Sequence, residues 1–173
     1  MKTKLMLAAL GTFAVIGFAA CDDDDDDIKT NDVPEAAQTE FDNMFPAASN
    51  VKWERKQIYY VADFRNGRSD MEAWYTGEGV WSMTETDLGE GNYAMTQLPE
   101  VLRAVIHNGK YSNSPIDDAD YYERPADEEF YVIEFEVSKD SDVSVVYLPD
   151  GTIVNEIENL DIEITPTTDL TLL

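Results

Sequence analysis

The sequence predicts an α+β fold made of two successive halves, each a helix followed by four antiparallel strands. A helical pattern begins at Val33-Pro34-Glu35 and again at Leu98-Pro99-Glu100, 65 residues later. After each start, the hydrophobic period changes from three or four residues to two, which is typical of half-buried strands. Two similar helix starts, each followed by the same change of hydrophobic period, indicate an internal repeat.

The helix of the first half is expected over residues 33–45. A proline in its first turn removes no helical hydrogen bond. Pro46 ends the pattern, because the residue before a proline avoids helical backbone. The apolar positions at helical spacing are Ala37, Phe41, Met44 and Phe45.

Alternating stretches follow this first helix and are separated by turn residues. Asn66-Gly67 is a typical two-residue hairpin turn, and Gly77 to Gly79 form a second turn. The sequence therefore predicts four strands in this half. They are residues 51–56, 58–64, 71–75 and 80–87.

The second half repeats this order. Its helix starts at Leu98 and is expected to stop at Asn108-Gly109. Val101, Leu102, Val105 and Ile106 form its apolar face. The expected strands are residues 120–123, 130–137, 143–147 and 152–157, with a turn at Asp150-Gly151.

These patterns divide the mature chain into two repeats and a tail. Residues 33–97 form repeat 1 and residues 98–157 form repeat 2. The tail, residues 158–173, is expected to add an edge strand or to stay loose.

The first 20 residues have the features of a secretory signal peptide. Lys2 and Lys4 precede a 16-residue apolar stretch that ends at Ala19-Ala20-Cys21. At about 1.5 Å per residue, this stretch is too short to span a hydrocarbon core of about 30 Å easily. Residues 18–21 resemble a bacterial lipobox, with Phe18 where Leu is usual. We expect Cys21, the only cysteine, to be the lipid attachment site and the first mature residue.

Six consecutive aspartates occupy residues 22–27. Like charges at this density stay extended and solvated, so residues 21–32 are expected to be a lipidated acidic tether. The run is either a spacer or an address, since it resembles the acidic signal of surface-exposed lipoproteins of Bacteroidetes. The second interpretation predicts an exported outer-membrane lipoprotein on the cell surface; otherwise the protein would face the periplasm.

The charge of the chain restricts its partners. After residues 1–20, 10 basic and 36 acidic residues remain, a net charge of −26. Nucleic acid is disfavoured, because phosphates need Lys and Arg as counterions. Anionic membrane surfaces are disfavoured too, so contact with the membrane is expected through the lipid anchor only. Three Trp, nine Tyr and seven Phe indicate a folded domain.

The sequence contains no recognisable catalytic set, and we expect no enzyme activity. His107, the only histidine, lies late on the second helix, where a solvated or capping role is expected. A nucleophile elbow, a dinucleotide loop and a phosphate loop are all missing from the sequence. A carboxylate-pair hydrolase stays open, because such pairs are defined by their separation in space.

Calcium is the one metal that the sequence favours. Asp117, Asp118 and Asp120 are expected in a loop before a strand, and hard carboxylate oxygens suit Ca²⁺. The spacing is not that of an EF-hand, so the alternative is a solvated acidic loop. No other cofactor is expected.

The aromatic residues of repeat 1 exceed what its small core is expected to hold. Tyr59 and Trp74 alternate oppositely to Tyr60, Phe64 and Tyr75. We expect Tyr59 and Trp74 to be at least partly exposed on the open face of the sheet, as anchors for a partner. The alternative is that both sets are buried, one beneath the helix and one against repeat 2.

Several short motifs occur across residues 33–157. They are Phe45-Pro46, Val51-Lys52-Trp53-Glu54, Ala62-Asp63-Phe64, Glu72-Ala73-Trp74-Tyr75, Gly79-Val80-Trp81, Thr84 to Leu88, Leu98-Pro99, and Tyr147 to Val154. Together they resemble the beta-lactamase-inhibitor-like, PepSY-like family of exported Bacteroidetes proteins. The resemblance implies one curved antiparallel sheet with the helices on one face, and a role in binding or restraining other proteins. It implies no functional role for any individual residue.

Three functional hypotheses follow. The favoured one is a non-catalytic envelope lipoprotein that binds, and in an inhibitory role restrains, an envelope or extracellular protein or peptide. The second is a calcium-binding or calcium-responsive protein. The third and most remote is a carboxylate-type hydrolase.

Overall fold

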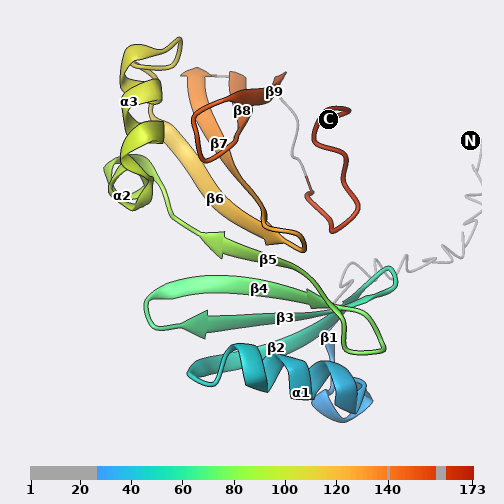
Figure 1. Ribbon diagram of the computed structural model, residues 1–173. Coiled ribbons are helices and arrows are strands. Elements are labelled where there is room, and N and C mark those ends of the chain that lie inside the picture. Colours follow the sequence, from blue (N-terminus) through green and yellow to red (C-terminus); the bar gives the residue numbers. More distant parts are fainter. Residues whose placement is uncertain (1–26, 140, 159–162) are drawn as a thin grey trace, which may run out of the picture.

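The computed structural model describes residues 27–139, 141–158 and 163–173 of the chain (Figure 1). The expected signal peptide, Cys21 and residues 22–26 of the aspartate run lie outside the described residues. Among the helices that are described, none combines the length and the apolar character needed to cross a bilayer.

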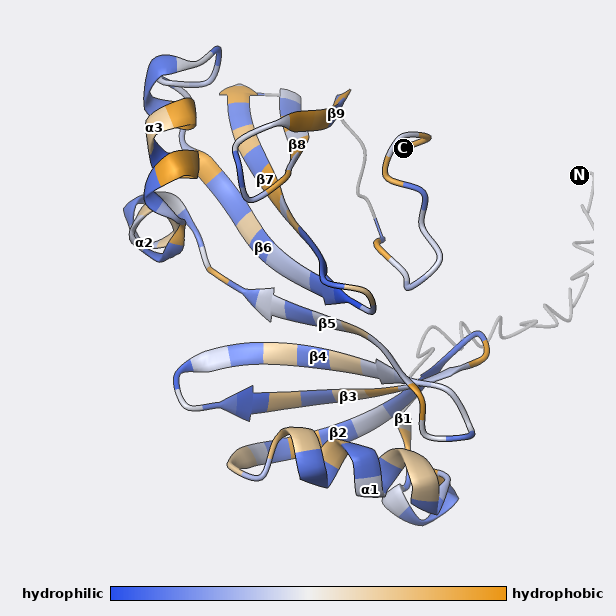
Figure 2. Ribbon diagram, viewed as in Figure 1, coloured by the Kyte–Doolittle hydropathy of each residue, from blue (hydrophilic) through white to orange (hydrophobic). Residues whose placement is uncertain are grey.

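The predicted α+β class is confirmed. Nine antiparallel strands form one open sheet in which each strand pairs with the next along the chain. Hydrophobic and hydrophilic residues alternate along the strands (Figure 2). The strands are β1 (Asp27–Ile28), β2 (Ala48–Lys56), β3 (Tyr59–Asn66), β4 (Ser69–Tyr75), β5 (Trp81–Asp87), β6 (Ile116–Arg124), β7 (Glu128–Ser138), β8 (Ser141–Tyr147) and β9 (Ile153–Glu158).

Both predicted helices form, and each begins directly after its proline. Helix α1 (Glu35–Met44) follows Pro34, and α3 (Glu100–Asn108) follows Pro99 and ends before Gly109, as expected. A helix that the sequence patterns did not reveal, α2 (Gly91–Gln97), precedes α3. It buries only Ala94, so its seven residues carry no clear apolar period.

The helices pack on the sheet through two apolar clusters. Phe41 of α1 lies 5.4 Å from the ring of Trp53 and 5.0 Å from that of Phe64. Leu102 and Ile106 of α3 belong to a second cluster together with side chains of β6, β7 and β8. The pairing register places the sheet residues of both clusters on one face, called here the helix face.

Two boundaries differ from the expectation. Residues 27–32, expected as the end of the tether, form β1 and the 3-10 helix η1 (Thr30–Asp32). Ile28 pairs with Trp53 and packs on the α1 cluster, which fixes this stretch to the sheet. Strand β6 begins at Ile116, four residues earlier than predicted. Ile116 and Ala119 are buried against the α3 cluster, and this packing outweighs the low strand preference of aspartate.

The described part of the tail, residues 163–173, is called here the C-terminal segment. It contains turns but no strand, and residues 159–162, where one of the two alternatives for the tail placed an edge strand, lie outside the described residues. The segment is nevertheless packed, since Ile164 and Leu170 are 3% and 8% exposed. These two residues contact the sheet face opposite the helices, called here the open face.

Candidate binding face

The open face is half apolar and half acidic. The pairing register aligns Val61 with Trp74 and Trp74 with Met83, which lie across β3, β4 and β5. Together with residues of β6, β7 and β8 they form a cluster that includes Ile164 and Leu170 of the C-terminal segment. We call its sheet residues the apolar patch: Tyr59, Val61, Trp74, Met83, Tyr122, Phe130, Val132 and Val146.

The expected exposure of Tyr59 and Trp74 is wrong. Both lie on the open face, as their alternation predicted, but they are only 6% and 1% exposed. Their rings pack edge to face with centroids 5.8 Å apart. The C-terminal segment and strands β6, β7 and β8 complete the cluster around them, so neither side chain is available as an anchor while the segment is in place.

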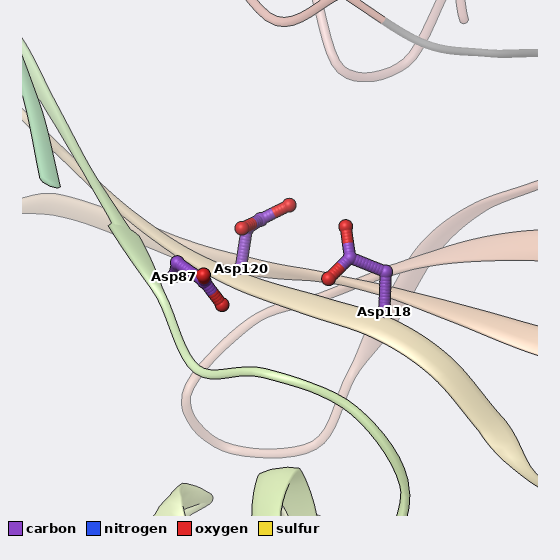
Figure 3. A group of neighbouring side chains, drawn as sticks. All are labelled: Asp87, Asp118 and Asp120. Atoms are coloured by element: carbon purple, nitrogen blue, oxygen red, sulfur yellow. The ribbon is translucent and has the colours of Figure 1, made fainter. Parts of the chain in front are cut away.

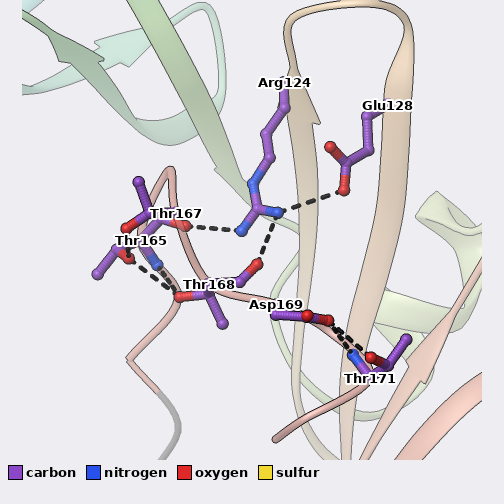
Figure 4. A network of polar contacts seen from close by, with 7 residues as sticks. All are labelled: Arg124, Glu128, Thr165, Thr167, Thr168, Asp169 and Thr171. Atoms are coloured by element: carbon purple, nitrogen blue, oxygen red, sulfur yellow. Dashed lines mark hydrogen bonds and ion pairs between the residues drawn. The ribbon is translucent and has the colours of Figure 1, made fainter.

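A buried arginine holds the C-terminal segment (Figure 4). Arg124 is 6% exposed, and its guanidinium donates hydrogen bonds to the carbonyl oxygens of Thr165 at 2.6 Å and Thr168 at 3.0 Å. Its Nη1 also lies 3.3 Å from the Glu128 carboxylate. The forked geometry of guanidinium lets one side chain satisfy two carbonyl groups, which fixes this turn of the segment on the sheet.

The other half of the open face carries a row of carboxylates, called here the acidic strip. The register places Asp63 opposite Glu72, Glu72 opposite Glu85, and Asp87 opposite Asp120. The strip comprises Asp63, Asp70, Glu72, Glu85, Asp87, Asp118 and Asp120. Like charges directly opposite one another destabilise a sheet, so this arrangement costs folding free energy.

Of the acidic strip, only Asp118 and Asp120 were predicted as site residues from the sequence. The acids of β3, β4 and β5, which share a face with them, were not predicted. The usable signal was the alternation itself, because Asp63, Glu72 and Glu85 each occupy the open-face position of adjacent predicted strands.

Two carboxyl groups of the strip titrate far from their ordinary range. Burial, with the charges of Glu85, Asp118 and Asp87, raises the pKa of Asp120 to about 8. Burial and the charge of Glu72 raise the pKa of Glu85 to about 7, although a hydrogen bond from Tyr122 opposes the shift. Close to neutral pH these groups therefore hold protons that a nearby cation would displace.

Lys56 stands at the border between the two halves. Its Nζ lies 3.2 Å from Glu72 and 3.6 Å from Glu54, and 5.3 Å from the centre of a Trp74 ring. A hollow of about 210 Å³ opens beside it. Glu72, Glu85, Asp120 and, from the C-terminal segment, Glu163 line this hollow. Further along the strip, a groove of about 200 Å³ is lined by Asp63, Asp70, Met71, Glu72, Glu85 and Asp87.

Three carboxylates come close enough to share a cation (Figure 3). One oxygen from each of Asp87, Asp118 and Asp120 lies within 4.8 Å of the others. The three residues lie on β5 and β6, not in the loop that the sequence predicted. Asp117, the third expected ligand, lies at a bulge between Ile116 and Asp118 and is not part of this trio. Asp87, on the paired strand, is the member that the local sequence pattern could not reveal.

His107 is exposed in the last turn of α3. This placement agrees with the solvated or capping role expected for it.

The chain is thus a sheet protein with a row of carboxylates and an acidic groove on one face, and comparison places it in a family. The family model of beta-lactamase-inhibitor-like, PepSY-like proteins matches residues 21–69 and 58–155, so the chain belongs to this family. The resemblance inferred from the sequence motifs is thereby confirmed. No curated protein matches the sequence.

Solved structures with the same fold come from Bacteroides species. A BLIP-like protein from Bacteroides fragilis is 26% identical with a TM-score of 0.66, over 76% of this chain and 91% of that one. A DUF2874 family protein from Bacteroides ovatus is 26% identical with a TM-score of 0.66, over 72% and 86%. A protein from Bacteroides eggerthii described as periplasmic is 20% identical with a TM-score of 0.64, over 73% and 88%.

Proposed function

We propose that this protein is a non-catalytic binding module whose acidic strip receives a basic segment of a partner protein or peptide. The observation that carries the proposal is the set of like-charged pairs across adjacent strands, Asp63 with Glu72, Glu72 with Glu85, and Asp87 with Asp120. Lys56 pairs with Glu72, Arg65 pairs with Asp70, and Lys52 lies opposite Asp63. Among the described residues, no basic side chain forms a salt bridge with Glu85, Asp87 or Asp120, where opposite charges would stabilise a sheet that served only as a scaffold. A cationic partner would be attracted by the same carboxylates that repel one another, and this charge complementarity would make binding specific for basic partners.

Two further observations support the proposal. Burial first, and neighbouring carboxylates second, raise the pKa values of Glu85 and Asp120, so a cation bound beside them would favour their ionised forms. Membership in a family named for its likeness to an inhibitor agrees with protein binding. The proposal includes an inhibitory role, in which binding restrains the partner. The partner is specified only as a protein or peptide with a basic segment.

The test is a binding titration with an extended decapeptide that alternates Lys and Thr. The double variant Asp63→Asn, Glu72→Gln should lose about tenfold in affinity, equivalent to about 1.4 kcal/mol. The matched control neutralises two exposed acids of the helices, Asp42→Asn and Glu100→Gln, which leaves the acidic strip unchanged. Equal losses in both double variants would mean that net charge alone attracts the peptide. Binding should also weaken steeply with added salt.

A calcium-binding role is the second candidate. The trio of Asp87, Asp118 and Asp120 offers three hard oxygen ligands within 4.8 Å of one another, and main-chain carbonyls or waters could complete a shell of six to eight oxygens. The site would then bridge the repulsive strip with a cation in place of a basic side chain. The remote hydrolase hypothesis would be tested by an activity screen on glycans and peptides.

We also propose that the chain is an exported lipoprotein anchored through Cys21, with its two helix-plus-strand halves as tandem repeats. The apolar leader before the single cysteine supports this, and a similar fold occurs in a protein described as periplasmic. Cys21→Ser should abolish labelling by a fatty-acid probe and release the protein into the soluble fraction. Replacing residues 22–27 with Ser and Gly should change surface display, measured by protease shaving of intact cells. Labelling of Cys21→Ser equal to that of the native chain would contradict the anchor.

A further inference from the structure

The C-terminal segment covers the apolar patch without extending the sheet. Strand β9 ends at Glu158, and residues 163–173 make their described hydrogen bonds through turns and side chains. Two apolar side chains, Ile164 and Leu170, enter the cluster around Trp74. The segment therefore occupies a sheet face in the manner of a bound peptide, through side-chain anchors and main-chain carbonyls.

The hydrogen bonds that hold the segment run from side chains of the sheet to main-chain carbonyl oxygens, as in the binding of a peptide. Arg124 donates to two carbonyl oxygens, and the Asn155 amide donates to those of Leu173 at 2.7 Å and Leu170 at 3.3 Å. Most of the remaining side chains of the segment face solvent, including Leu172 at 81% exposure. The sheet thus binds the segment through its main chain and the aliphatic side chains of Ile164, Leu170 and Leu173, which other peptides could also supply.

The segment begins with an acidic residue beside the acidic strip. Glu163 lines the same hollow as Glu72, Glu85 and Asp120. Lys56 is the one cation in this lining, and it is already paired with Glu54 and Glu72. A ligand with a cation at the position of Glu163 would fit this hollow better than the segment does.

We propose that the C-terminal segment is an internal occupant of the binding face, which the basic partner displaces. This inference rests on the proposed function and specifies its partner: a peptide with a basic residue over Glu72, Glu85 and Asp120, followed by aliphatic residues at the places of Ile164 and Leu170. The apolar patch and the acidic strip then form one continuous binding site. Release of the segment regulates access to the apolar half.

The experiment uses a free peptide with the sequence of residues 163–173 carrying Glu163→Lys, titrated against the mature chain. In Leu170→Asp, a carboxylate replaces a buried anchor of the segment and leaves the sheet intact. This variant should bind the peptide at least about tenfold more tightly than the native chain, because a competitor that occupies the site most of the time weakens apparent affinity by the open fraction. Leu172→Asp makes the same change at an exposed position of the segment and should bind like the native chain.

A second variant keeps the test decisive if Leu170→Asp fails to fold. Asn155→Ala removes the two hydrogen bonds to the end of the segment, together with the one that its Oδ1 accepts from the Glu156 backbone N–H, and should give an intermediate gain in affinity. The proposal is overturned if folded Leu170→Asp and Asn155→Ala bind no better than Leu172→Asp. It is also overturned if both variants unfold, because the segment would then be an integral part of the core.

The outcomes separate this inference from the proposed function. If the Lys-Thr decapeptide binds the acidic strip of every variant equally and the Glu163→Lys peptide gains nothing in Leu170→Asp, the function stands and the displacement is wrong. If the unmodified peptide of residues 163–173 gains in Leu170→Asp as much as the Glu163→Lys peptide, the segment is displaceable but the preference for a cation fails. That second result contradicts the proposed basic partner.

Discussion

The two halves of the open face differ in their side chains and in whether the chain covers them. Around Trp74 and Met83, the sheet carries large apolar side chains, and the chain covers them with its own C-terminal segment. Around Glu72 and Glu85, it carries paired acids and leaves them lining a groove. The covered half contributes to stability through burial. The uncovered half opposes stability where its carboxylates face one another, and the proposed function gives this repulsion a role.

The largest expected effect tests the covered half. Trp74→Ala should lower the free energy of unfolding by about 3–5 kcal/mol, because it removes a large side chain from a closed cluster. Chemical denaturation of the purified domain measures this loss. Tyr93→Ala is the matched control, since Tyr93 is an aromatic residue at 59% exposure and its removal should cost little. A loss below about 1 kcal/mol for Trp74→Ala would mean that the segment does not seal the patch.

The pH dependence of stability tests the uncovered half. Glu85 and Asp120 have folded-state pKa values of about 7 and about 8, above those of an unfolded chain. Between about pH 4 and pH 8 the folded state therefore binds more protons than the unfolded state, and the stability contributed by these groups falls as pH rises. Thermal or chemical unfolding measured across this range should show the decline.

The variants Glu85→Gln and Asp120→Asn should flatten that decline. Each should stabilise the protein at pH 8 by about 1–3 kcal/mol, because a neutral amide has no charge to desolvate. Glu100→Gln, on the exposed surface of α3, is the control and should change stability by less than about 0.5 kcal/mol. Unchanged or lower stability of both variants at pH 8 would show that the repulsion is already relieved in the native protein.

Calcium should give the smallest effect. If the trio of Asp87, Asp118 and Asp120 binds Ca²⁺ in the folded state only, millimolar calcium should raise Tm by about 2–4 °C. Asp118→Asn should remove this shift, whereas Asp117→Asn, one residue away and outside the trio, should retain it. An equal rise in Tm with Mg²⁺ or at matched ionic strength would mean that calcium acts only by screening the repulsion between the carboxylates.

Sequence periodicity predicted the helices and strands well and the environment of the open face only in part. The starts of α1 and α3 follow from Pro34 and Pro99, and the strands follow from alternation, because these signals are local. The alternation also placed Tyr59 and Trp74 on the correct face. Their burial could not be predicted, because it depends on Ile164 and Leu170, about 90 residues or more further along the chain.

The candidate site shows the same limit. Asp118 and Asp120 stand out within one acidic stretch, but their neighbours Asp87 and Glu85 come from a strand some 30 residues earlier. Only the pairing of β5 with β6 brings them together, since the register sets which acids stand opposite one another. The sequence therefore indicated a site made of carboxylates, but only the strand order and register show which carboxylates lie together.

The central claim is that the acidic strip, and not the helix side, receives a basic partner. The most direct measurement is a map of backbone amide shifts in the mature chain during titration with the Lys-Thr decapeptide. We predict perturbations concentrated on β3, β4, β5 and β6 around Asp63, Glu72, Glu85 and Asp120, with α1 and α3 unaffected. Perturbations centred on α3, or spread evenly over all exposed acids, would contradict the account.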